Sequence, residues 1–382
     1  MRIVCGLDVH KDSVFVCILN EKGEKFEAKY GVLTPELEEL HQLLLTHEVK
    51  EVTMESTSIY WHPIWRILGD IECLKLVNPY FIKQLPGRKS DVRDAAWIAE
   101  CTMKDLIRGS FVPDATVQRM RQYNRIFDLN KEKVYKLTKL DALLHRCNIR
   151  ISNYVSSIDS KSYKEVVRLL SEGIVDAERL MEAIHGRTVN RVGKDVIRAA
   201  LAGVVNEVDI DLIRQYREEL LIDDKHLKEC QNKLTEICRN EFPKEFENLQ
   251  TIPGVKERSA TSILSELGAD MKMFLTASAL VSWCGLKPRN EESAGKIKSR
   301  RITHGNKYIR KTMIECAWGA SRTQDCFYSN FSYIQTVVRR KNAMKVKVAI
   351  ARKMLVAIWH VLSETVPYND YKKPKAIADG NS

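Results

Sequence analysis

Four carboxylates stand out by where they lie in the sequence. Asp8 lies inside a short apolar, β-branched segment, and Glu55 ends a second segment of this kind. Asp91 and Asp94 follow in a segment of helical pattern, and a spacing of three residues places them on one helix face. A carboxylate inside an otherwise buried strand is costly unless a cation meets it. The sequence therefore predicts that Asp8, Glu55, Asp91 and Asp94 together bind a metal ion.

Oxygen ligands of this kind favour Mg²⁺. Two such ions held about 3.5–4 Å apart stabilise the attacking and leaving oxygens in phosphoryl transfer, which is the chemistry that the four acids predict. A plainer alternative is that Asp91 caps a helix and that Asp94 pairs with Arg88 or Arg93. Asp12 lies in a polar turn and is interpreted as a turn former.

The elements that must position these acids read as a three-layer α/β domain over residues 1–117. Residues 1–20 predict two strands around a polar turn, with Asp8 in the first strand. A helix is expected at 35–47, a strand at 51–55, a helix after Tyr60 and a strand at 74–77. Strands and helices in this order are typical of a sheet covered by helices.

The middle of the chain, residues 118–245, has the pattern of long helices. Apolar residues follow a three-four spacing from about 118 to 155, and a second stretch repeats at intervals of seven, at Ile213, Leu220, Leu227 and Leu234. Short helices are expected between the two stretches, at 156–205. We expect an antiparallel coiled coil that joins subunits into a homodimer or homotetramer; the alternative is that these stripes only face the protein core.

Residues 246–366 predict a mostly helical third domain, followed by a flexible tail at 367–382. Ile252-Pro-Gly254 forms a turn that leads into a helix, as in helix-hairpin-helix units. Backbone N–H groups at such a turn accept phosphate without reading sequence. The alternative is an ordinary packing corner between two helices.

A basic loop lies in this third domain. Between Lys287 and Lys311, nine Lys or Arg residues stand against two Glu, a balance that suits a phosphate backbone. Ser293 lies within this loop, beside Ala294 and Gly295. A second basic run at 339–353 fits either a nucleic acid backbone or a solvated helix face. The residues predicted to bind nucleic acid are Lys256, Arg289, Lys296, Lys298, Arg300, Arg301, Lys307 and Arg310.

Composition narrows the class of protein. A net charge of +11 and a pI near 9.0 favour an anionic partner. The ten cysteines include no CxxC pair, which argues against a zinc finger and indicates reduced thiols. The N-terminus lacks the pattern of a signal peptide, and no apolar run approaches the roughly 18 residues that span a bilayer, so we expect a bacterial or archaeal cytoplasmic protein without a membrane partner.

Five motifs occur in an order that resembles a known family. They are Gly6-Leu-Asp-Val-His-Lys11, Met54-Glu-Ser-Thr57, Lys89-Ser-Asp-Val-Arg-Asp-Ala95, Ile252-Pro-Gly254 and Glu292-Ser-Ala-Gly-Lys296 through Gly305-Asn-Lys-Tyr-Ile-Arg310. Together they resemble the DEDD transposases of the insertion sequence 110 family. The resemblance covers roughly residues 1–100 and 246–325.

This resemblance implies a RuvC-like RNase H fold whose four acids are Asp8, Glu55, Asp91 and Asp94. It also implies a second domain that supplies a serine nucleophile, which aligns with Ser293, although Ser299 lies close by. Such enzymes recombine double-stranded donor and target DNA under the guidance of a structured bridge RNA. The expected product of serine attack is a covalent phosphoserine at a composite site, and the retained ester allows rejoining without ATP.

Three other functions remain open at this point. A RuvC-like structure-specific endonuclease would use metal-activated water, and Ser293 would then only bind phosphate. A non-catalytic scaffold would use the acids as helix caps and ion pairs. An RNA-binding regulator would bind RNA and leave DNA unchanged.

Overall fold

The computed structural model describes residues 1–79, 94–107, 109–123, 125–288, 291–293, 296–299 and 301–370, with only the backbone of 291–293 and 296–299. The chain divides into two compact units, Met1–Val112 and Pro113–Ser382, which are described separately. No helix in these described ranges combines the length and the apolar character that crossing a membrane requires.

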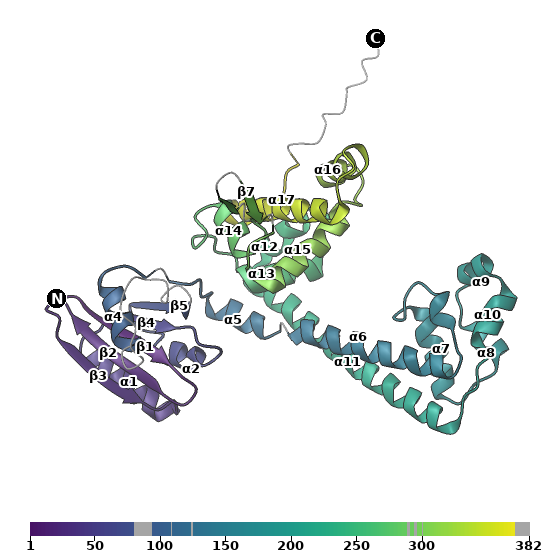
Figure 1. The fold of residues 1–382 in the computed structure, drawn as a ribbon, viewed down its shortest axis with the longest axis horizontal. Helices are drawn as coiled ribbons and strands as arrows, with labels where there is room; N and C mark the ends of the chain where they lie inside the picture. The colour runs from purple at the N-terminus through teal and green to yellow at the C-terminus, as the bar shows by residue number, and fades with distance from the viewer. Residues whose placement is uncertain are drawn as a thin grey trace, which may run out of the picture. The chain divides into compact units, whose positions relative to one another are not determined.

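The first unit is built on a five-stranded mixed sheet (Figure 1). Its order is β3-β2-β1-β4-β5; β1, β2 and β3 are antiparallel neighbours, whereas β4 runs parallel to β1 and to β5. The strands are β1 (Ile3–Val9), β2 (Val14–Asn20), β3 (Lys25–Tyr30), β4 (Glu51–Glu55) and β5 (Cys73–Val77), and the helices are α1 (Thr34–Thr46), α2 (Trp61–Ile67) and α4 (Asp94–Met103). The predicted α/β class is confirmed for this unit, and β3 is a strand that the sequence did not predict.

Helices cover both faces of the sheet because side chains alternate along its central strand. Cys5, Leu7 and Val9 bury against one apolar cluster that includes Leu40 of α1 and Ile64 of α2. Residues of the other parity, beginning with Val4, bury against the alanines of α4 in a separate cluster. Asp8 has the parity of Val4, so it belongs to the face that α4 covers.

Gly6 sets how closely α4 approaches this face. A Cβ placed on Gly6 would lie 2.2 Å from the carbonyl oxygen of Ala95 and 2.5 Å from the backbone nitrogen of Ala99. Both atoms belong to the helix backbone, so neither moves without displacing α4. The glycine of the motif therefore permits backbone-to-backbone contact at the position two residues before Asp8.

We expect Gly6→Ala to lower the melting temperature of the first unit by about 10 °C or more. Overpacking of this kind costs about 1–3 kcal/mol, and each kcal/mol shifts the midpoint of a domain of about 100 residues by about 4–8 °C. Calorimetry of the whole chain measures the shift. Gly69→Ala is the matched control, since a Cβ there would meet its nearest neighbour at 3.4 Å; equal melting of the two variants would contradict the close approach.

The second unit begins with helices that pair along their length (Figure 1). After α5 (Ala115–Gln122), α6 (Arg125–Arg146) packs beside α11 (Glu207–Glu241). Between them lie a 3-10 turn, η1 (Ile151–Asn153), and four short helices, α7 (Lys161–Ser171), α8 (Ala177–Glu182), α9 (Gly186–Val192) and α10 (Lys194–Leu201). We call residues 151–205 the helical cap.

The single long helical stretch expected from about 118 to 155 is wrong in its extent. Met120 belongs to the separate helix α5, and α6 ends at Arg146. Asn148 then has a φ of 57°, a left-handed conformation that Asn tolerates better than most residues and that stops a helix. Val134, one of the apolar residues at three-four spacing in this stretch, is 60% exposed.

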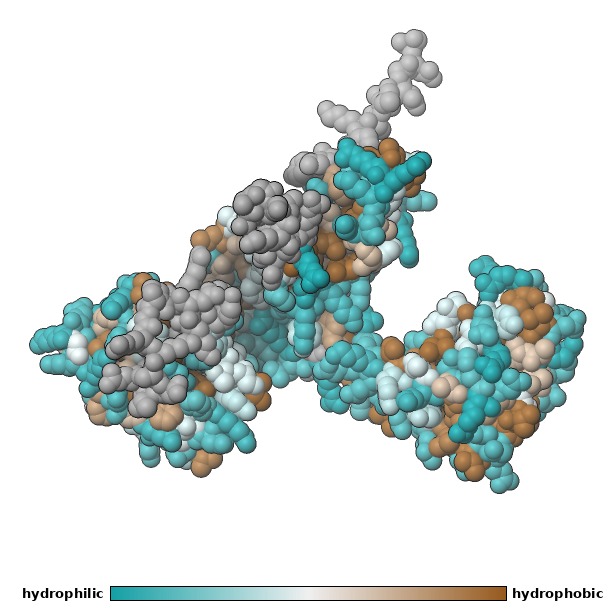
Figure 2. All heavy atoms as spheres, in the orientation of Figure 1, coloured by the Kyte–Doolittle hydropathy of each residue, from teal (hydrophilic) through white to brown (hydrophobic). Residues whose placement is uncertain are grey.

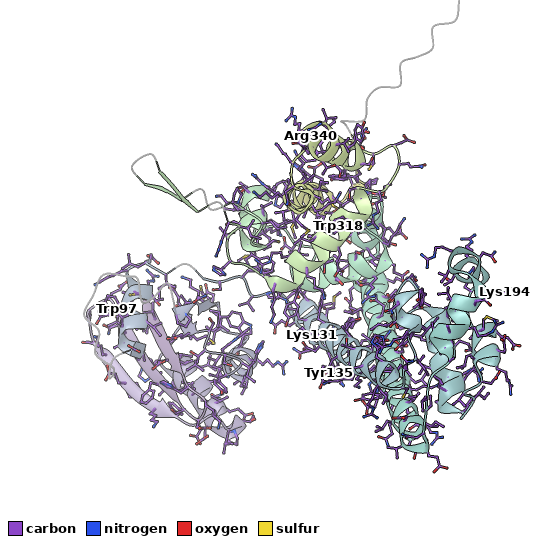
Figure 3. All side chains as sticks on the ribbon, turned by 45° about the vertical axis from the view of Figure 1, so that its right-hand side comes forward. Trp97, Lys131, Tyr135, Lys194, Trp318 and Arg340 are labelled. Atoms are coloured by element: carbon purple, nitrogen blue, oxygen red, sulfur yellow. The ribbon has the colours of Figure 1, made fainter. Side chains whose placement is uncertain are left out.

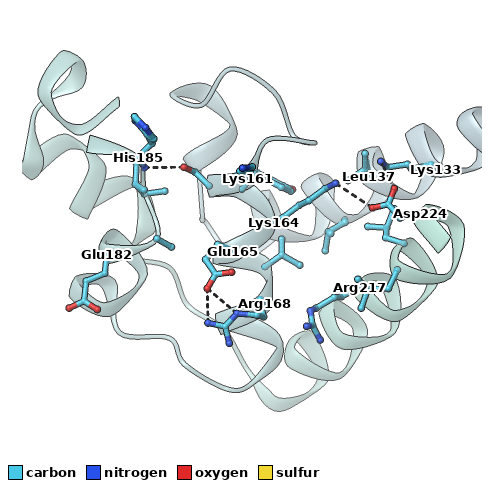
Figure 4. A pocket seen from close by; sticks show the side chains of 18 residues that line it. Lys133, Leu137, Lys161, Lys164, Glu165, Arg168, Glu182, His185, Arg217 and Asp224 are labelled. Carbon is cyan, nitrogen blue, oxygen red and sulfur yellow. Dashed lines mark hydrogen bonds and ion pairs between the residues drawn. The ribbon is translucent and has the colours of Figure 1, made fainter. Parts of the chain in front are cut away.

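A cavity of about 600 Å³ lies where the helical cap meets α6 and α11 (Figure 4). Several of its charged side chains form ion pairs: Lys164 and Lys133 each pair with Asp224, and Arg168 pairs with Glu165 within α7 at 2.6 Å. The two pairs with Asp224 connect α7 and α6 to α11, so we assign these charges a role in holding the cap.

The remainder of the second unit is mostly helical, as predicted. It contains α12 (Pro243–Gln250), α13 (Glu257–Leu267), α14 (Ala277–Trp283), α15 (Lys307–Ala320), α16 (Phe327–Tyr333), a π-helical turn η2 (Ile334–Val338) and α17 (Ala343–Glu364), with a two-stranded hairpin of β6 (Glu291–Ser293) and β7 (Lys296–Ser299).

The flexible tail was predicted to begin at 367, but the structure holds the chain as far as Asp370. The Asp370 carboxylate accepts from the backbone of Phe327 at 2.8 Å, and the Tyr368 backbone donates to the Thr251 hydroxyl at 2.8 Å. Residues 371–382 lie outside the described residues.

Candidate functional site

Asp8 is the penultimate residue of β1 and is 9% exposed. Its Oδ2 lies 3.0 Å from Nε2 of His10, which is itself half exposed. A carboxylate at this depth is costly without a cationic or hydrogen-bonding partner. The sequence did not assign His10, although its spacing of two residues from Asp8 was a usable signal.

Glu55 lies at the carboxyl end of β4, beside Asp8. The parallel register pairs Leu7 with Met54, so one further residue brings Asp8 level with Glu55 at the same edge of the sheet. Paired residues of parallel strands point to the same face, which is the face covered by α4. The Thr57 hydroxyl donates to Oε1 of Glu55 at 3.3 Å.

Glu51, at the opposite end of β4, carries a carboxylate that pairs with cations of the protein. Arg2 contacts it at 2.7 Å, and Lys75 donates a second, short hydrogen bond. Burial alone would raise the pKa of Glu51, but the hydrogen bonds from Lys75 and Arg2 outweigh it and lower the pKa. Glu51 is thus held ionised by cations of the protein itself.

Asp94 is the first residue of α4 and lies at the same end of the first unit as Asp8. Ala95 packs on Gly6, and the far end of α4 contacts Arg2 through the carbonyls of Thr102 and Met103. The helix therefore runs opposite to β1 and starts near the carboxyl ends of β1 and β4. Three of the four predicted acids lie at this end of the unit, and Asp91 lies outside the described residues.

The described acids do not by themselves form a group that could bind a metal ion. Within the part of the chain that the structure describes, no group of three His, Cys, Asp or Glu side chains is close enough to hold a metal ion. One buried polar atom on this side of the sheet has no hydrogen-bond partner among the described atoms, the hydroxyl of the fully buried Thr53. Thr53 pairs with Gly6, so it lies on the face of Asp8 and Glu55.

Ser293 lies in a hairpin where a loop had been expected. It ends β6, and its backbone pairs with Lys296 at the start of β7. The side chains of this hairpin lie outside the described residues, so the choice between Ser293 and Ser299 stays a prediction.

The base of this hairpin is closed by the backbone. A Cβ placed on Gly305 would lie 2.3 Å from the nitrogen of Gly285, whose own φ is +69°. Thr303 donates to the carbonyl of Lys287 at 2.9 Å, and Asn306 donates to that of Trp283 at 3.1 Å. The two ends of segment 286–304 are therefore fixed against each other.

A buried network that the sequence did not reveal positions the end of this segment. Glu266 of α13 is 2% exposed; its carboxylate accepts from the Asn306 side chain and lies 3.8 Å from Nε of Arg121. Burial lowers the pKa of Arg121, and the charge of Glu266 partly offsets this. Asn306 in turn caps α15 by accepting from Tyr308 and Ile309. No local pattern marks Glu266, because its partners lie far away in the sequence.

The predicted helix-hairpin-helix turn is present between α12 and α13. Gly254 has a φ of +84°, and a Cβ there would lie 2.4 Å from the carbonyl oxygen of Cys316 on α15. The turn is thus packed against α15, so phosphate binding and simple packing both stay open as interpretations.

The predicted nucleic-acid-binding residues are described only in part. Lys256, Arg301 and Lys307 are exposed and Arg310 is half-buried. The side chains of Arg289, Lys296, Lys298 and Arg300 lie outside the described residues. The described cations flank both the helix-hairpin-helix turn and the hairpin base.

Comparison with known proteins agrees with these motifs. A model described as "Transposase IS116/IS110/IS902 family" matches residues 246–331, and a transposase model of the IS110 DEDD type matches residues 5–149. A protein of Pseudomonas aeruginosa named as a family 20 transposase is 23% identical over 326 residues, covering 83% of this chain and 85% of its own length. A protein of Sinorhizobium fredii named as transposase y4pF/y4sB is 23% identical over 306 residues, covering 77% and 68%.

The two family models match an N-terminal and a C-terminal part of the chain and together span more than half of it. Their ranges include Asp8, Glu55 and Ser293, the residues on which the predicted chemistry depends. The chain belongs to the IS110 family of transposases, enzymes that cut and rejoin DNA.

Proposed function

We propose that this transposase cuts DNA by attack of the Ser293 hydroxyl on a phosphodiester, with Mg²⁺ held by Asp8, Glu55, Asp91 and Asp94 of an RNase H-like domain. The observation that carries the proposal is the level position of Asp8 and Glu55 at the carboxyl ends of adjacent parallel strands. DEDD transposases are in general metal-dependent. The sheet order β3-β2-β1-β4-β5, with helices on both faces, supports the RNase H-like assignment.

The residues present fit a hard cation. All four predicted ligands offer carboxylate oxygens, the donors that Mg²⁺ prefers in proteins. When bound, Mg²⁺ would neutralise charge on the scissile phosphate and favour the deprotonated serine. Asp8 and Glu55 would hold it from β1 and β4, and Asp94 from the start of α4.

The covalent step conserves the bond energy of the DNA. Oγ of Ser293 forms a bond to phosphorus, the bridging oxygen of the DNA leaves and takes up a proton, and a serine phosphodiester results. A DNA hydroxyl then attacks the same phosphorus, and Oγ leaves. No co-reactant is consumed, because each step exchanges one phosphodiester for another.

Two further parts of the proposal concern partners. A structured bridge RNA as guide rests on the family resemblance alone. Assembly into a homodimer or homotetramer through the region 118–245 is supported by exposed apolar residues of α11 and the helical cap. They include Leu221, Ile222, Val204 and Val208. Figure 2 shows both apolar and polar surface on the molecule. The division into parts 1–117, 118–245, 246–366 and 367–382 belongs to this proposal as well.

Mapping of the covalent bond tests the mechanism. The purified protein is incubated with DNA of the element's ends, copurifying RNA and Mg²⁺, then denatured and digested, and the nucleotide-bearing peptide is sequenced by mass spectrometry. The proposal requires the nucleotide on Ser293. A nucleotide on Ser299 would move the nucleophile, and cleaved DNA without any protein-linked nucleotide would favour the endonuclease that uses metal-activated water.

A further inference from the structure

A groove in the second unit lies between α6, α13 and α15, and its lining contains no residue assigned above to the carboxylate site. Its volume is about 630 Å³. Its walls bring together aromatic rings, cations and small hydroxyls, including Phe127, Lys131, Tyr135, Arg258 and Lys311. Lys131 and Tyr135 lie about one turn apart on α6 (Figure 3).

The two aromatic side chains differ in exposure: Phe127 is half-buried, whereas Tyr135 is exposed, with Nζ of Lys139 5.4 Å from its ring centre. Tyr135 is 62% exposed, although a large ring of this kind is usually more buried. The Phe127 ring lies 5.2 Å from the ring of Tyr308 at an angle of 44°. Rings that face solvent side by side with cations are the platforms on which unpaired bases stack in single-strand binding proteins.

The charges along the groove favour phosphate. Nζ of Lys311 lies 5.3 Å from the Phe127 ring centre, and Nζ of Lys307 lies 5.0 Å from that of Tyr308. Arg258 is exposed in the first turn of α13 and forms no ion pair among the described side chains. The lining of the groove contains the cations Lys131, Arg258 and Lys311 and one acid, Glu315, so cations outnumber acids. Asp128, outside the lining, pairs with Lys131 at 3.2 Å.

The same chemistry argues against a helix of a second copy as the occupant. An apolar helix laid in the groove would take Arg258 and Lys311 out of water without supplying anions, which costs several kcal/mol for each buried ion. A strand of DNA supplies both a flat apolar base and a phosphate. Because the family cuts and rejoins DNA, its activity brings DNA to this protein.

We propose that this groove binds unpaired DNA, with a base stacked on Tyr135 and the neighbouring phosphate held by Arg258 and Lys311. The inference rests on the DNA activity of the family. It does not depend on the serine nucleophile or on the metal site.

Fluorescence anisotropy with the full-length chain in EDTA tests this inference, because chelation removes any contribution of the carboxylate site. The probes are a labelled oligo(dT), a blunt-ended DNA duplex without a loop, and an oligo(U) of the same length as the oligo(dT). We expect Tyr135→Ala to weaken oligo(dT) binding about tenfold, since one base–aromatic stack contributes about that factor, and to leave binding of the duplex unchanged. Tyr135→Phe keeps the ring and should bind as the wild type does.

Tyr333→Ala is the matched control, because Tyr333 is 60% exposed but lies on α16, outside the groove. Arg258→Gln should lower the slope of log K against log salt for oligo(dT) by about 0.7, the value of one phosphate contact on a single strand. Equal losses for Tyr135→Ala and Tyr333→Ala, a loss confined to oligo(U), or a change in subunit number with unchanged oligo(dT) binding would each overturn the proposal.

A failure here is distinguishable from failure of the proposed mechanism. The peptide mapping above reports the nucleophile even if the groove binds nothing. Conversely, oligo(dT) binding in EDTA reports the groove even if Ser293 carries no nucleotide.

Discussion

Asp8→Asn is expected to reduce DNA strand cleavage by about a thousandfold while the protein stays folded. The substitution removes a negative charge that would bind Mg²⁺ and keeps the shape of the side chain. Metal stabilisation of a phosphoryl-transfer transition state amounts to several kcal/mol, and each 1.36 kcal/mol is a factor of ten in rate. Cleavage of a labelled DNA substrate under single-turnover conditions measures the effect.

Stability gives this first prediction a second readout. Wild-type protein should melt at a higher temperature in Mg²⁺ than in EDTA, because a ligand that binds only the folded state stabilises it. The Asp8→Asn substitution should abolish this difference and, in EDTA, leave the melting temperature equal to or above that of the wild type, since a nearly buried charge is removed.

Asp12→Asn provides the matched control for Asp8→Asn. Asp12 is exposed in the turn between β1 and β2, four residues from Asp8. It should retain both cleavage and the response to Mg²⁺. If Asp8→Asn also retained cleavage, Asp8 would be a structural carboxylate paired with His10, and the metal site would have to be sought elsewhere.

Ser293→Ala is expected to abolish both the covalent protein–DNA adduct and strand transfer. Alanine has no side-chain oxygen to form the ester, so neither the adduct nor strand transfer should be detectable. DNA binding should remain, because a single hydroxyl adds little to the affinity of an interface held mainly by charge. Denaturing gels of the DNA report the adduct, and a filter-binding assay reports the affinity.

Ser299→Ala is the natural comparison, because it removes the same group from the partner strand of the same hairpin. Ser299 pairs through its backbone with Glu291, and the variant should keep adduct formation. Continued cleavage by Ser293→Ala without an adduct would identify metal-activated water as the nucleophile.

Strands and helices with a clear apolar period were predictable from the sequence. The β1–β2 hairpin, β4 and β5 all carry β-branched residues bounded by turns, and the level position of Asp8 and Glu55 follows once the two strands pair. β3 escaped prediction because its residues are Lys25-Phe-Glu-Ala-Lys-Tyr30, a mostly exposed edge strand without a buried stripe. Charged edge strands are common because they block further pairing.

Contacts between residues that lie far apart in the sequence could not be predicted. The apolar repeats indicated that α6 and α11 pack along each other. They did not indicate that α6 ends at Arg146, two residues before the left-handed residue Asn148. Nor does any motif connect Glu266 with Arg121 and Asn306. Such partners are set by the packing of α5, α13 and α15, which no local period encodes.

The glycine contact between Gly285 and Gly305 has a consequence for how the family can vary. Because the two ends of segment 286–304 are joined at the backbone, the chain leaves and re-enters the domain at a single point. Insertions or deletions in the hairpin would change how far it extends from the domain but would leave α14 and α15 in place. The reason is that the free-energy cost of closing a loop depends only weakly on loop length. The hairpin could thus be exchanged between transposases as a module, with Gly285 and Gly305 as the splice points.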